Sequence, residues 1–367
     1  MNYNQVKILV ISNYRSTITV RPEAEVFIGL AKMGFPITIM TYGDSAYVAH
    51  FKKAGIKVID FHPQKKFDRR EIRFIHEELI SGGYHILHLY NGKAMINGLQ
   101  AARSLSAKVI LYRGYEGNIH WYDPTIYFKF LNPRVDAILC NSKGVQEYVD
   151  KAMVLVKNKT VTINKGHRLE WYEDIKPLER KELGLHSKDL VLVCGANNRR
   201  MKGVPYLLKS LHHLPPGLQI RLLLVGRDMD TEENLKIVQG SNYADRVHFL
   251  GFRKDNLKIV KMADFFVLAS LYGESITKSV LESMSLGTPA IITNIPGNRE
   301  MIEDGKSGFV VPKKNPAAMA AAIQKAYNER SLSQTMGQAA RKRIQTRFHS
   351  DITIKEYAEF YGELLGE

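Results

Sequence analysis

Two glutamates open a stretch of the sequence that could bind a phosphorylated sugar. Glu274 and Glu282 lie eight positions apart in GESITKSVLE, after the apolar run ADFFVLAS. A helix that starts near Ser275 would place both carboxylates on about the same face, since eight positions make a little over two turns. The first N–H groups of such a helix have no intrahelical partner and carry about half a positive charge. The pattern therefore predicts a diphosphate at the helix start, with the two carboxylates hydrogen-bonded to sugar hydroxyls on either side.

A solvated helix with two surface glutamates is the alternative interpretation, and the spacing alone does not exclude it. The context favours a site, because an apolar run precedes the helix and the small-residue run SMSLGTPAI follows it. Glu282 lies within VLESM, where solvent exposure is not expected, and a buried carboxylate without a partner is costly.

The elements that would position this site alternate between strand and helix patterns in both halves of the chain. Strands that alternate with helices of roughly 10–15 residues predict parallel sheets that helices cover on both faces. The polar segment 164–188 contains no strand pattern and separates the two series. Apolar runs predict the main strands at 7–12, 36–42, 56–61, 84–90, 108–113, 190–196 and 220–226.

The length of 367 residues favours two domains. We expect an α/β protein with two Rossmann-like, doubly wound parallel-sheet domains that face an interdomain cleft. Open parallel sheets bind ligands at the carboxyl ends of their strands. The expected limits are 1–165 for the first domain, 166–345 for the second domain, and 346–367 for a last helix.

The chain is basic, with 52 Lys and Arg against 37 Asp and Glu and a net charge of +15. Residues 1–165 hold 23 of the basic and 13 of the acidic residues, so the excess is concentrated there. Such a surface favours an anionic partner. The basic run 63–74 could rest on anionic lipid or be an ordinary solvated helix face. We expect no nucleic acid partner, because no nucleic-acid motif accompanies the run.

Cysteine usage and the absence of apolar spans predict the compartment. Cys140 and Cys194 lie in apolar runs and are expected to be buried thiols of a reducing compartment. No signal-peptide layout and no apolar run of about 18 residues occurs. We therefore expect a cytoplasmic protein, with peripheral contact at the inner membrane face left open.

The residues from 273 to 311 resemble the donor-site signature of the retaining glycosyltransferases of family 4, which are group 1 glycosyltransferases with the GT-B fold. The family has a Glu-x7-Glu pair, a G-x-P strand, a G-x-x-E turn and a G-x-x-G segment. These correspond to Glu274 with Glu282, and to residues 287–289, 297–300 and 305–308. The resemblance covers most of the chain and is strongest over residues 190–312. It implies that the domain 1–165 binds the acceptor, that the domain 166–345 binds the donor, and that the helix 346–367 returns to the N-terminal domain.

The resemblance implies a role for each matching position. Glu274 would bind hydroxyls of the transferred sugar, and Glu282 would bind the donor ribose. The backbone at Thr277 and Lys278 would cradle the diphosphate. Lys202, which stands before a glycine in RRMKG, would offset charge on the leaving diphosphate, where a positive group helps most as charge develops.

Two departures from the family pattern affect the donor site. Ser275-Ile276-Thr277 replaces the usual Gly-Phe-Gly, so close approach of the Ser275 backbone is less free. Asn197 stands where the family has a phosphate-binding arginine. Arg199 or Arg200 could take that place, because a guanidinium binds phosphate through two hydrogen bonds. An exposed basic loop is the alternative.

A third departure lies in the first half, where Arg113 stands in place of a histidine that the family has near the reacting sugar. Arg113 could contact the donor sugar, its phosphate or an anionic acceptor, or form a structural ion pair with Glu116. His120 and Tyr122 follow in NIHWYDP, where acceptor contact and simple packing are equally open.

Further acceptor candidates are less specific. Arg15 lies in the loop 12–25, where the family commonly has a Gly-Gly turn that faces the acceptor, yet this loop has no glycine. The two histidines of YHILHLYN, His85 and His88, are expected to be core residues rather than ligands.

The resemblance implies a hexosyltransferase-type enzyme that moves a sugar from a nucleotide diphosphate-sugar to a hydroxyl of a saccharide or lipid-linked acceptor, in cell-surface polysaccharide or glycolipid synthesis. It implies retention of configuration, with no cofactor, no metal and no protein nucleophile. The nucleotide base is expected near residues 250–255. A nucleotide-sugar epimerase or phosphorolytic enzyme on the same fold and a catalytically silent basic binding protein remain alternatives.

Overall fold

The protein is described by a computed structural model over residues 3–16, 20–153 and 159–366. It forms two compact units. Unit 1 comprises Met1–Gly166 and Phe348–Glu367, and unit 2 comprises His167–Arg347. Residues 17–19 of the loop 12–25 lie outside the described residues. None of the helices within the described ranges is long and apolar enough to cross a membrane.

Unit 1 is built on a parallel sheet with the strand order β3-β2-β1-β4-β5-β6-β7. The central strand β1 pairs Ile8 with Ile37 on one side and with Ile86 on the other. The inner strands are mostly apolar and buried, because helices cover both of their faces. The strands are β1 Ile8–Ile11, β2 Ile37–Thr41, β3 Lys57–Asp60, β4 Ile86–Leu89, β5 Lys108–Arg113, β6 Ala137–Cys140 and β7 Thr160–Thr162.

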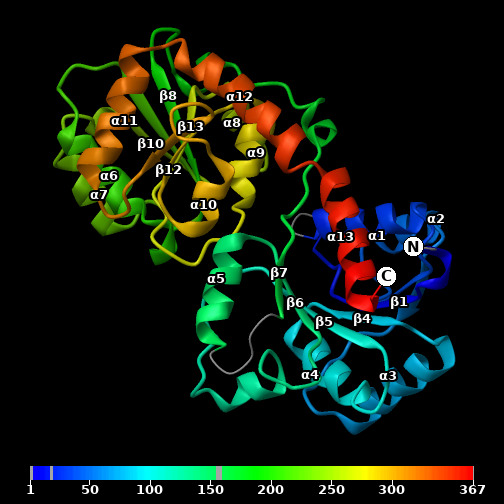
Figure 1. Ribbon diagram of the computed structural model, residues 1–367. Helices are drawn as coiled ribbons and strands as arrows, with labels where there is room; N and C mark the ends of the chain where they lie inside the picture. The colour runs from blue at the N-terminus through cyan, green and yellow to red at the C-terminus, as the bar shows by residue number, and fades with distance from the viewer. Residues whose placement is uncertain (1–2, 17–19, 154–158, 367) are drawn as a thin grey trace. The chain divides into compact units, whose positions relative to one another are not determined.

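Two layers of helices cover this sheet, one on each face (Figure 1). One layer contains α1 Arg21–Lys32, α2 Val48–Lys53 and the C-terminal α13 Ser350–Leu365. The other contains α3 Arg69–Gly82, α4 Gly92–Ala101 and α5 Lys143–Ala152. Short 3₁₀ turns are η1 Tyr3–Gln5 and η2 Pro124–Phe128.

The C-terminal helix α13 packs against α1, as Figure 1 shows. The two helices approach closely at Gly29, where a Cβ would lie 2.3 Å from Ile354 Cδ1. Beneath them, the ring of His88 is fully buried and its Nδ1 lies 2.9 Å from Tyr361 Oη. The expectation of a core residue is confirmed for His88. It is wrong for His85, which is exposed before β4 and accepts a hydrogen bond from the Lys7 N–H.

Unit 2 is built on a second parallel sheet with the order β10-β9-β8-β11-β12-β13. Both sheets and their helix layers have the architecture expected from the sequence. The strands are β8 Leu190–Gly195, β9 Ile220–Val225, β10 Val247–Gly251, β11 Phe265–Leu268, β12 Ala290–Thr293 and β13 Gly308–Val311.

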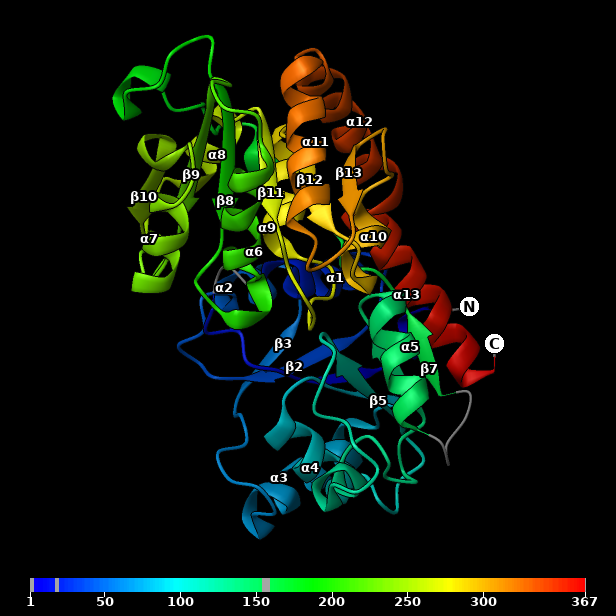
Figure 2. The same cartoon turned by 90° about the vertical axis from the view of Figure 1, so that its left-hand side faces the viewer.

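Helices also cover both faces of the second sheet. Figure 2 shows α6 and α11 in front of the strands, where they pack together and α7 packs on α6. On the other face, α9 packs on both α8 and α12. The helices are α6 Val204–Ser210, α7 Glu232–Gln239, α8 Asn256–Met262, α9 Lys278–Leu286, α10 Pro296–Met301, α11 Pro316–Asn328 and α12 Leu332–Arg347, with 3₁₀ turns η3 Leu169–Tyr172, η4 Arg180–Leu183, η5 Arg200–Lys202, η6 Leu211–His213 and η7 Ala244–Arg246.

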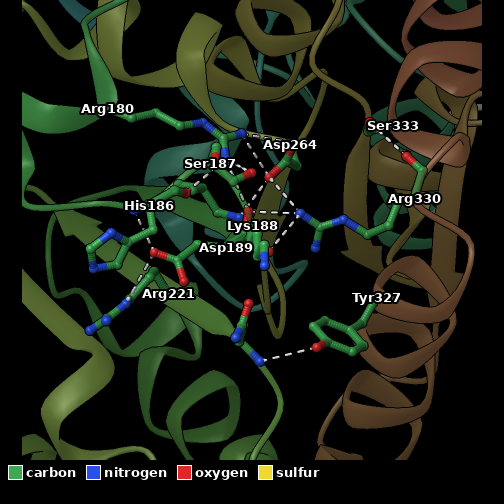
Figure 3. Close-up of polar contacts among 12 residues, drawn as sticks. Arg180, His186, Ser187, Lys188, Asp189, Arg221, Asp264, Tyr327, Arg330 and Ser333 are labelled. Atoms are coloured by element: carbon green, nitrogen blue, oxygen red, sulfur yellow. Dashed lines mark hydrogen bonds and ion pairs between the residues drawn. The ribbon is translucent and has the colours of Figure 1, made fainter.

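A polar network fastens the strandless segment before β8 to the amino-terminal edge of the second sheet (Figure 3). Arg180 donates two hydrogen bonds to Asp264, at 3.0 and 3.1 Å. The same carboxylate accepts from the Val191 N–H of β8 at 2.7 Å. Arg330 donates to the Asp189 carbonyl at 2.7 Å. Parallel sheets bind ligands at the carboxyl ends of their strands, which lie at the opposite edge of this sheet. We therefore assign this network a stabilising role and not a catalytic one.

His88 gives the stability of unit 1 a specific pH dependence. Burial lowers the pKa of His88 from 6.5 to about 3. Below pH 6.5 the unfolded chain binds a proton that the folded chain does not, so the free energy of unfolding falls as the pH falls. This histidine should contribute a slope of about 1.4 kcal/mol per pH unit. In urea titrations from pH 6.5 to about pH 4, His88→Leu should flatten the slope, and the exposed His50→Leu should leave it in place. Equal slopes in all three proteins would contradict the assignment.

Candidate active site

The helix that follows the first glutamate starts later than the sequence suggests. α9 begins at Lys278, with Thr277 as its N-cap, and not near Ser275. The chain first makes a bend over Ser275 and Ile276, after Gly273 adopts a left-handed φ of 75°. Glu274 therefore lies on the loop between β11 and α9, whereas Glu282 lies within the helix. The structure places Glu274 at the strand-to-helix turn, as the sequence predicts, and only the expected helix start near Ser275 is wrong.

The amino-terminal end of α9 is not capped by a side chain. Threonine at an N-cap commonly accepts a hydrogen bond from the second or third helical amide, but the Thr277 hydroxyl makes no such bond. It lies 3.0 Å from Asn298 Oδ1 and 3.3 Å from Glu274 Oε2 instead. No acidic residue occupies the first turn. The amides of Lys278 and Ser279 are thus without an intrahelical acceptor, and no acidic residue within the first turn opposes the positive end of the helix dipole.

A buried ion pair lies directly beside this helix start. Lys202 Nζ is 2.5 Å from Glu274 Oε1, and both side chains are largely shielded from solvent. The Ser270 hydroxyl donates to the same carboxylate oxygen at 3.0 Å. A buried pair of this kind requires further hydrogen bonds to offset the loss of hydration. Ser270 and Thr277 supply them, so the carboxylate is held in one orientation.

The second glutamate of the motif is also paired. Glu282 is 9% exposed, and its carboxylate accepts a hydrogen bond from the Lys278 ammonium one turn earlier on α9. The prediction that Glu282 is not a surface residue is confirmed. The pair places one acidic and one basic group along the first two turns of α9, next to the uncapped amides.

Close backbone approaches bring the two loops of the site together. Gly203 has a φ of 64°, and a Cβ there would lie 2.0 Å from the Ala269 carbonyl oxygen. The Leu271 N–H donates to the Met201 carbonyl at 2.7 Å. The loop after β8, which carries Lys202, is therefore fixed against the loop after β11, which carries Glu274. Both loops lie at the carboxyl ends of adjacent strands, where parallel sheets bind ligands.

A third loop supports the site from β12. At Gly297 a Cβ would lie 2.1 Å from the Ser275 carbonyl oxygen, so α10 packs directly on the bend before α9. Asn298 is fully buried and holds the Thr277 hydroxyl. Asn298 and Ser270 were not among the predicted site residues. The G-N-R-E turn contained a signal for Asn298, since that turn was matched to the family, but nothing in the sequence singled out Ser270.

The basic candidates after β8 divide into one structural residue and two exposed ones. Asn197 accepts a hydrogen bond from the Arg227 N–H at 3.1 Å, which ties the ends of β8 and β9 together. Arg199 and Arg200 are exposed, and within the described residues no ion pair involves either. Their guanidinium groups are thus available to an anion, whereas the Asn197 side chain is occupied by the backbone.

The segment expected near the nucleotide base follows β10. Phe252 is exposed, and the guanidinium carbon of Arg227 lies 5.2 Å from the centre of its ring. Arg253 forms a two-point ion pair with Asp255, at 2.8 and 2.7 Å. The segment therefore presents an aromatic ring beside the loop after β9.

Arg113 ends β5 in unit 1 and is occupied by its own loop. Its Nε donates to the Tyr115 carbonyl at 2.9 Å and its Nη2 donates to the Gly117 carbonyl. The guanidinium also lies 3.7 Å from the centre of the Tyr115 ring. Burial lowers the pKa of Arg113. These contacts indicate that Arg113 holds the loop 114–118 in shape. Any effect of Arg113 on a ligand would therefore be indirect, through the conformation of that loop.

The acceptor candidates of unit 1 are spread over two loops. Arg15 forms an exposed ion pair with Asp44 at 2.9 Å. His120 and Tyr122 stack on each other with ring centres 5.1 Å apart, and both are exposed. Glu116 is half-buried in the loop that Arg113 shapes. The structure thus groups Glu116 with Arg113, and His120 with Tyr122.

Comparison with known proteins identifies the unit that carries this site. Residues 175–343 match the sequence model of glycosyl transferases group 1. The matched residues lie within unit 2, so unit 2 resembles the glycosyl transferases of group 1. Among curated relatives, N-acetyl-alpha-D-glucosaminyl L-malate synthase of Bacillus anthracis is 27% identical over 51% of this chain and 49% of its own length. The capsular polysaccharide biosynthesis glycosyltransferase CapM of Staphylococcus aureus is 26% identical over 63% of this chain and 62% of its own length.

The fold of the whole chain resembles solved glycosyltransferases of the GT-B class. The structure of HepE from Anabaena in complex with UDP has a TM-score of 0.77 and 20% identity, and covers 98% of this chain and all of its own. The GT-B fold expected from the sequence is therefore confirmed. The chain spans about half to two thirds of the length of the two curated relatives named above.

Gly297→Ala should distort the candidate site through the backbone of Ser275. The added methyl group meets a carbonyl oxygen that is part of a fixed loop, so the free energy of unfolding should fall by at least about 2 kcal/mol. Gly92→Ala is the control, because a Cβ there meets nothing within 4 Å. Chemical denaturation of both variants tests this, and equal stability of the two would show that α10 does not press on the bend.

Proposed function

We propose that the protein is a glycosyltransferase that uses a nucleotide diphosphate-sugar as donor, bound at the start of α9. The observation that carries this proposal is the uncapped helix start beside the Lys202–Glu274 ion pair. Uncapped amides and a helix dipole favour an anion, and two lysines add charge at the same place. HepE, which shares the fold, binds UDP and, in a second structure, UDP-glucose.

Each group of the site has a role in this proposal. The amides of Lys278 and Ser279 accommodate the diphosphate, and Lys202 offsets the charge that develops on it as the sugar leaves. Glu274 hydrogen-bonds hydroxyls of the transferred sugar, since its orientation is fixed by Ser270 and Thr277. Glu282 binds the ribose hydroxyls one turn further along α9. Arg199 and Arg200 add exposed positive charge near the phosphates.

We propose that transfer proceeds with retention, by attack of the acceptor hydroxyl on the face from which the diphosphate departs. The departing phosphate oxygen takes the acceptor proton, so no protein nucleophile is needed. Lys202, Lys278 and the helix amides supply the positive charge, so the proposal needs no metal. The acceptor is a hydroxyl of a saccharide or of a lipid-linked saccharide. The named role of CapM in capsular polysaccharide biosynthesis supports a function in cell-surface polysaccharide synthesis.

Lys202→Ala and Glu282→Ala should each lower kcat/KM for the donor by well over tenfold, or more than about 1.4 kcal/mol in transition-state stabilisation. The control is Lys236→Ala, because Lys236 forms an exposed ion pair with Glu232 on α7. The donor is first chosen by thermal shift with UDP, GDP, ADP, CMP and their sugars. Turnover of both site variants near that of the wild type, with folding confirmed by circular dichroism, would contradict the site.

The product of the reaction should have the same anomeric configuration as the donor sugar. Proton NMR of the product measures this from the coupling of the anomeric proton. Release of nucleotide should require a saccharide acceptor. Isomerisation of the donor sugar without any acceptor would instead support an epimerase, and an inverted product would contradict front-side attack.

A further inference from the structure

Two segments of unit 1 that are far apart in the sequence form one exposed surface. The loop before α3 carries Lys65, Lys66 and Phe67, and the segment around η2 carries Trp121 and Phe128. The rings of Phe67 and Phe128 meet edge to face, with their centres 5.0 Å apart. The Tyr127 hydroxyl donates to the Trp121 carbonyl at 2.9 Å, which folds the second segment on itself.

The aromatic rings of this surface are exposed to an unusual degree. Trp121 is 66% exposed and Tyr122 is 67% exposed, while Phe67 and Phe128 are 46% and 43% exposed. Clustered exposed aromatic side chains on a soluble domain mark interaction sites. With Lys65, Lys66 and Lys129 they form what we call the aromatic–basic surface.

The protein holds Phe67 outward by specific contacts. Phe67 has a φ of 57°, which is an outlier for a bulky residue. Its N–H donates to Asn97 Oδ1 at 2.9 Å, and Asn97 Nδ2 donates to the Lys65 carbonyl at 2.9 Å. Asn97 is itself fully buried on α4. The exposed position of the ring is therefore built into the fold and does not result from a loosely held loop.

The acidic side chains of these segments accept hydrogen bonds from backbone N–H groups. Asp68 caps α3 by accepting from the Arg70 and Glu71 amides, and these bonds lower the pKa of Asp68. Glu71 accepts from the Gln64 N–H at 2.8 Å. Asp123 accepts from the Thr125 N–H at 2.9 Å.

The basic side chains of the surface, and those of the first turn of α3, form no ion pair within the described residues. Over residues 3–16, 20–153 and 159–366, no ion pair involves the side chain of any of these residues, which are Lys65, Lys66, Arg69, Arg70 and Lys129. The surface therefore combines exposed aromatic rings with basic side chains that no ion pair engages.

We propose that the aromatic–basic surface docks on an anionic phospholipid bilayer. Aromatic side chains favour the headgroup level of a membrane, and basic side chains near it are attracted by anionic lipid. The edge-to-face contact covers one ring face of the Phe67–Phe128 pair, which makes the pair a poor platform for stacked nucleic acid bases. The inference rests on the proposed function in one respect, because it implies that the acceptor of the proposed sugar transfer is a membrane-bound molecule. It also gives Tyr122 a lipid contact in place of an acceptor contact.

Fluorescence of Trp121 tests this directly. The chain has two tryptophans, Trp121 and Trp171, so Trp171→Phe leaves Trp121 as the reporter. Its emission should shift to shorter wavelength on addition of vesicles of phosphatidylcholine with phosphatidylglycerol, and brominated lipid should quench it. Vesicles of phosphatidylcholine alone should give a much smaller change. The readout needs no donor or acceptor, so failure of sugar transfer would leave it unaffected.

Charge-reversal variants and polar replacements of phenylalanine separate the electrostatic and the apolar contributions to membrane binding, which vesicle co-sedimentation measures. Lys65→Glu/Lys66→Glu should lower the partition coefficient by at least about tenfold. The control Lys52→Glu/Lys53→Glu makes the same charge change on α2, which lies on the other face of the sheet. Phe67→Ser/Phe128→Ser should also weaken binding, and the exposed Ile80→Ser should not.

Three results would overturn the proposal. One is absence of a Trp121 shift with anionic vesicles while circular dichroism shows a folded protein. Another is an equal loss of binding in the Lys52/Lys53 control, which would indicate general charge attraction. The third is a stronger response to RNA or heparin than to vesicles, which would assign the surface to a soluble polyanion.

Discussion

The uncapped start of α9 is the constraint on which the rest of unit 2 depends. A helix end with free amides is unfavourable unless water or a ligand satisfies them, and here the residue best suited to do so turns its hydroxyl away. Thr277 instead fixes Glu274, which in turn holds Lys202. Thr277 thus leaves the first amides of α9 uncapped and helps to order the Glu274–Lys202 ion pair beside them.

Backbone contacts maintain this arrangement. Gly203 and Gly297 each stand where a side chain would strike a carbonyl oxygen of a neighbouring loop, at Ala269 and Ser275. Interiors this tightly packed transmit small displacements. The three loops after β8, β11 and β12 therefore move as one body or not at all, so the geometry offered to a donor is set largely before binding. Preorganisation of this kind is a main source of electrostatic stabilisation in enzymes.

The sequence predicted the fold and the burial of Glu282 because both leave periodic or local pattern signals. Alternating apolar runs specify the two parallel sheets, and the burial of Glu282 follows from the apolar residues around it. The helix start at Lys278 was misplaced because Gly273 and the contact at Gly297 are tertiary effects that spacing does not report. For the same reason Ser270 was missed, and His85 was placed in the core although β4 begins one residue later, at Ile86. The aromatic–basic surface was predicted only as a basic run, because Trp121 and Phe128 join Lys65 and Phe67 through folding.

The central claim is that α9 and Lys202 bind a diphosphate, and calorimetric titration with nucleotides that differ by one phosphate tests it most directly. The nucleoside diphosphate that stabilises the protein most is compared with its monophosphate in the wild type and in Lys202→Ala. The account predicts that the second phosphate strengthens binding to the wild type by at least about tenfold, and that most of this gain is lost in the variant. Equal affinities of mono- and diphosphate in the wild type, or an undiminished gain without Lys202, would contradict it.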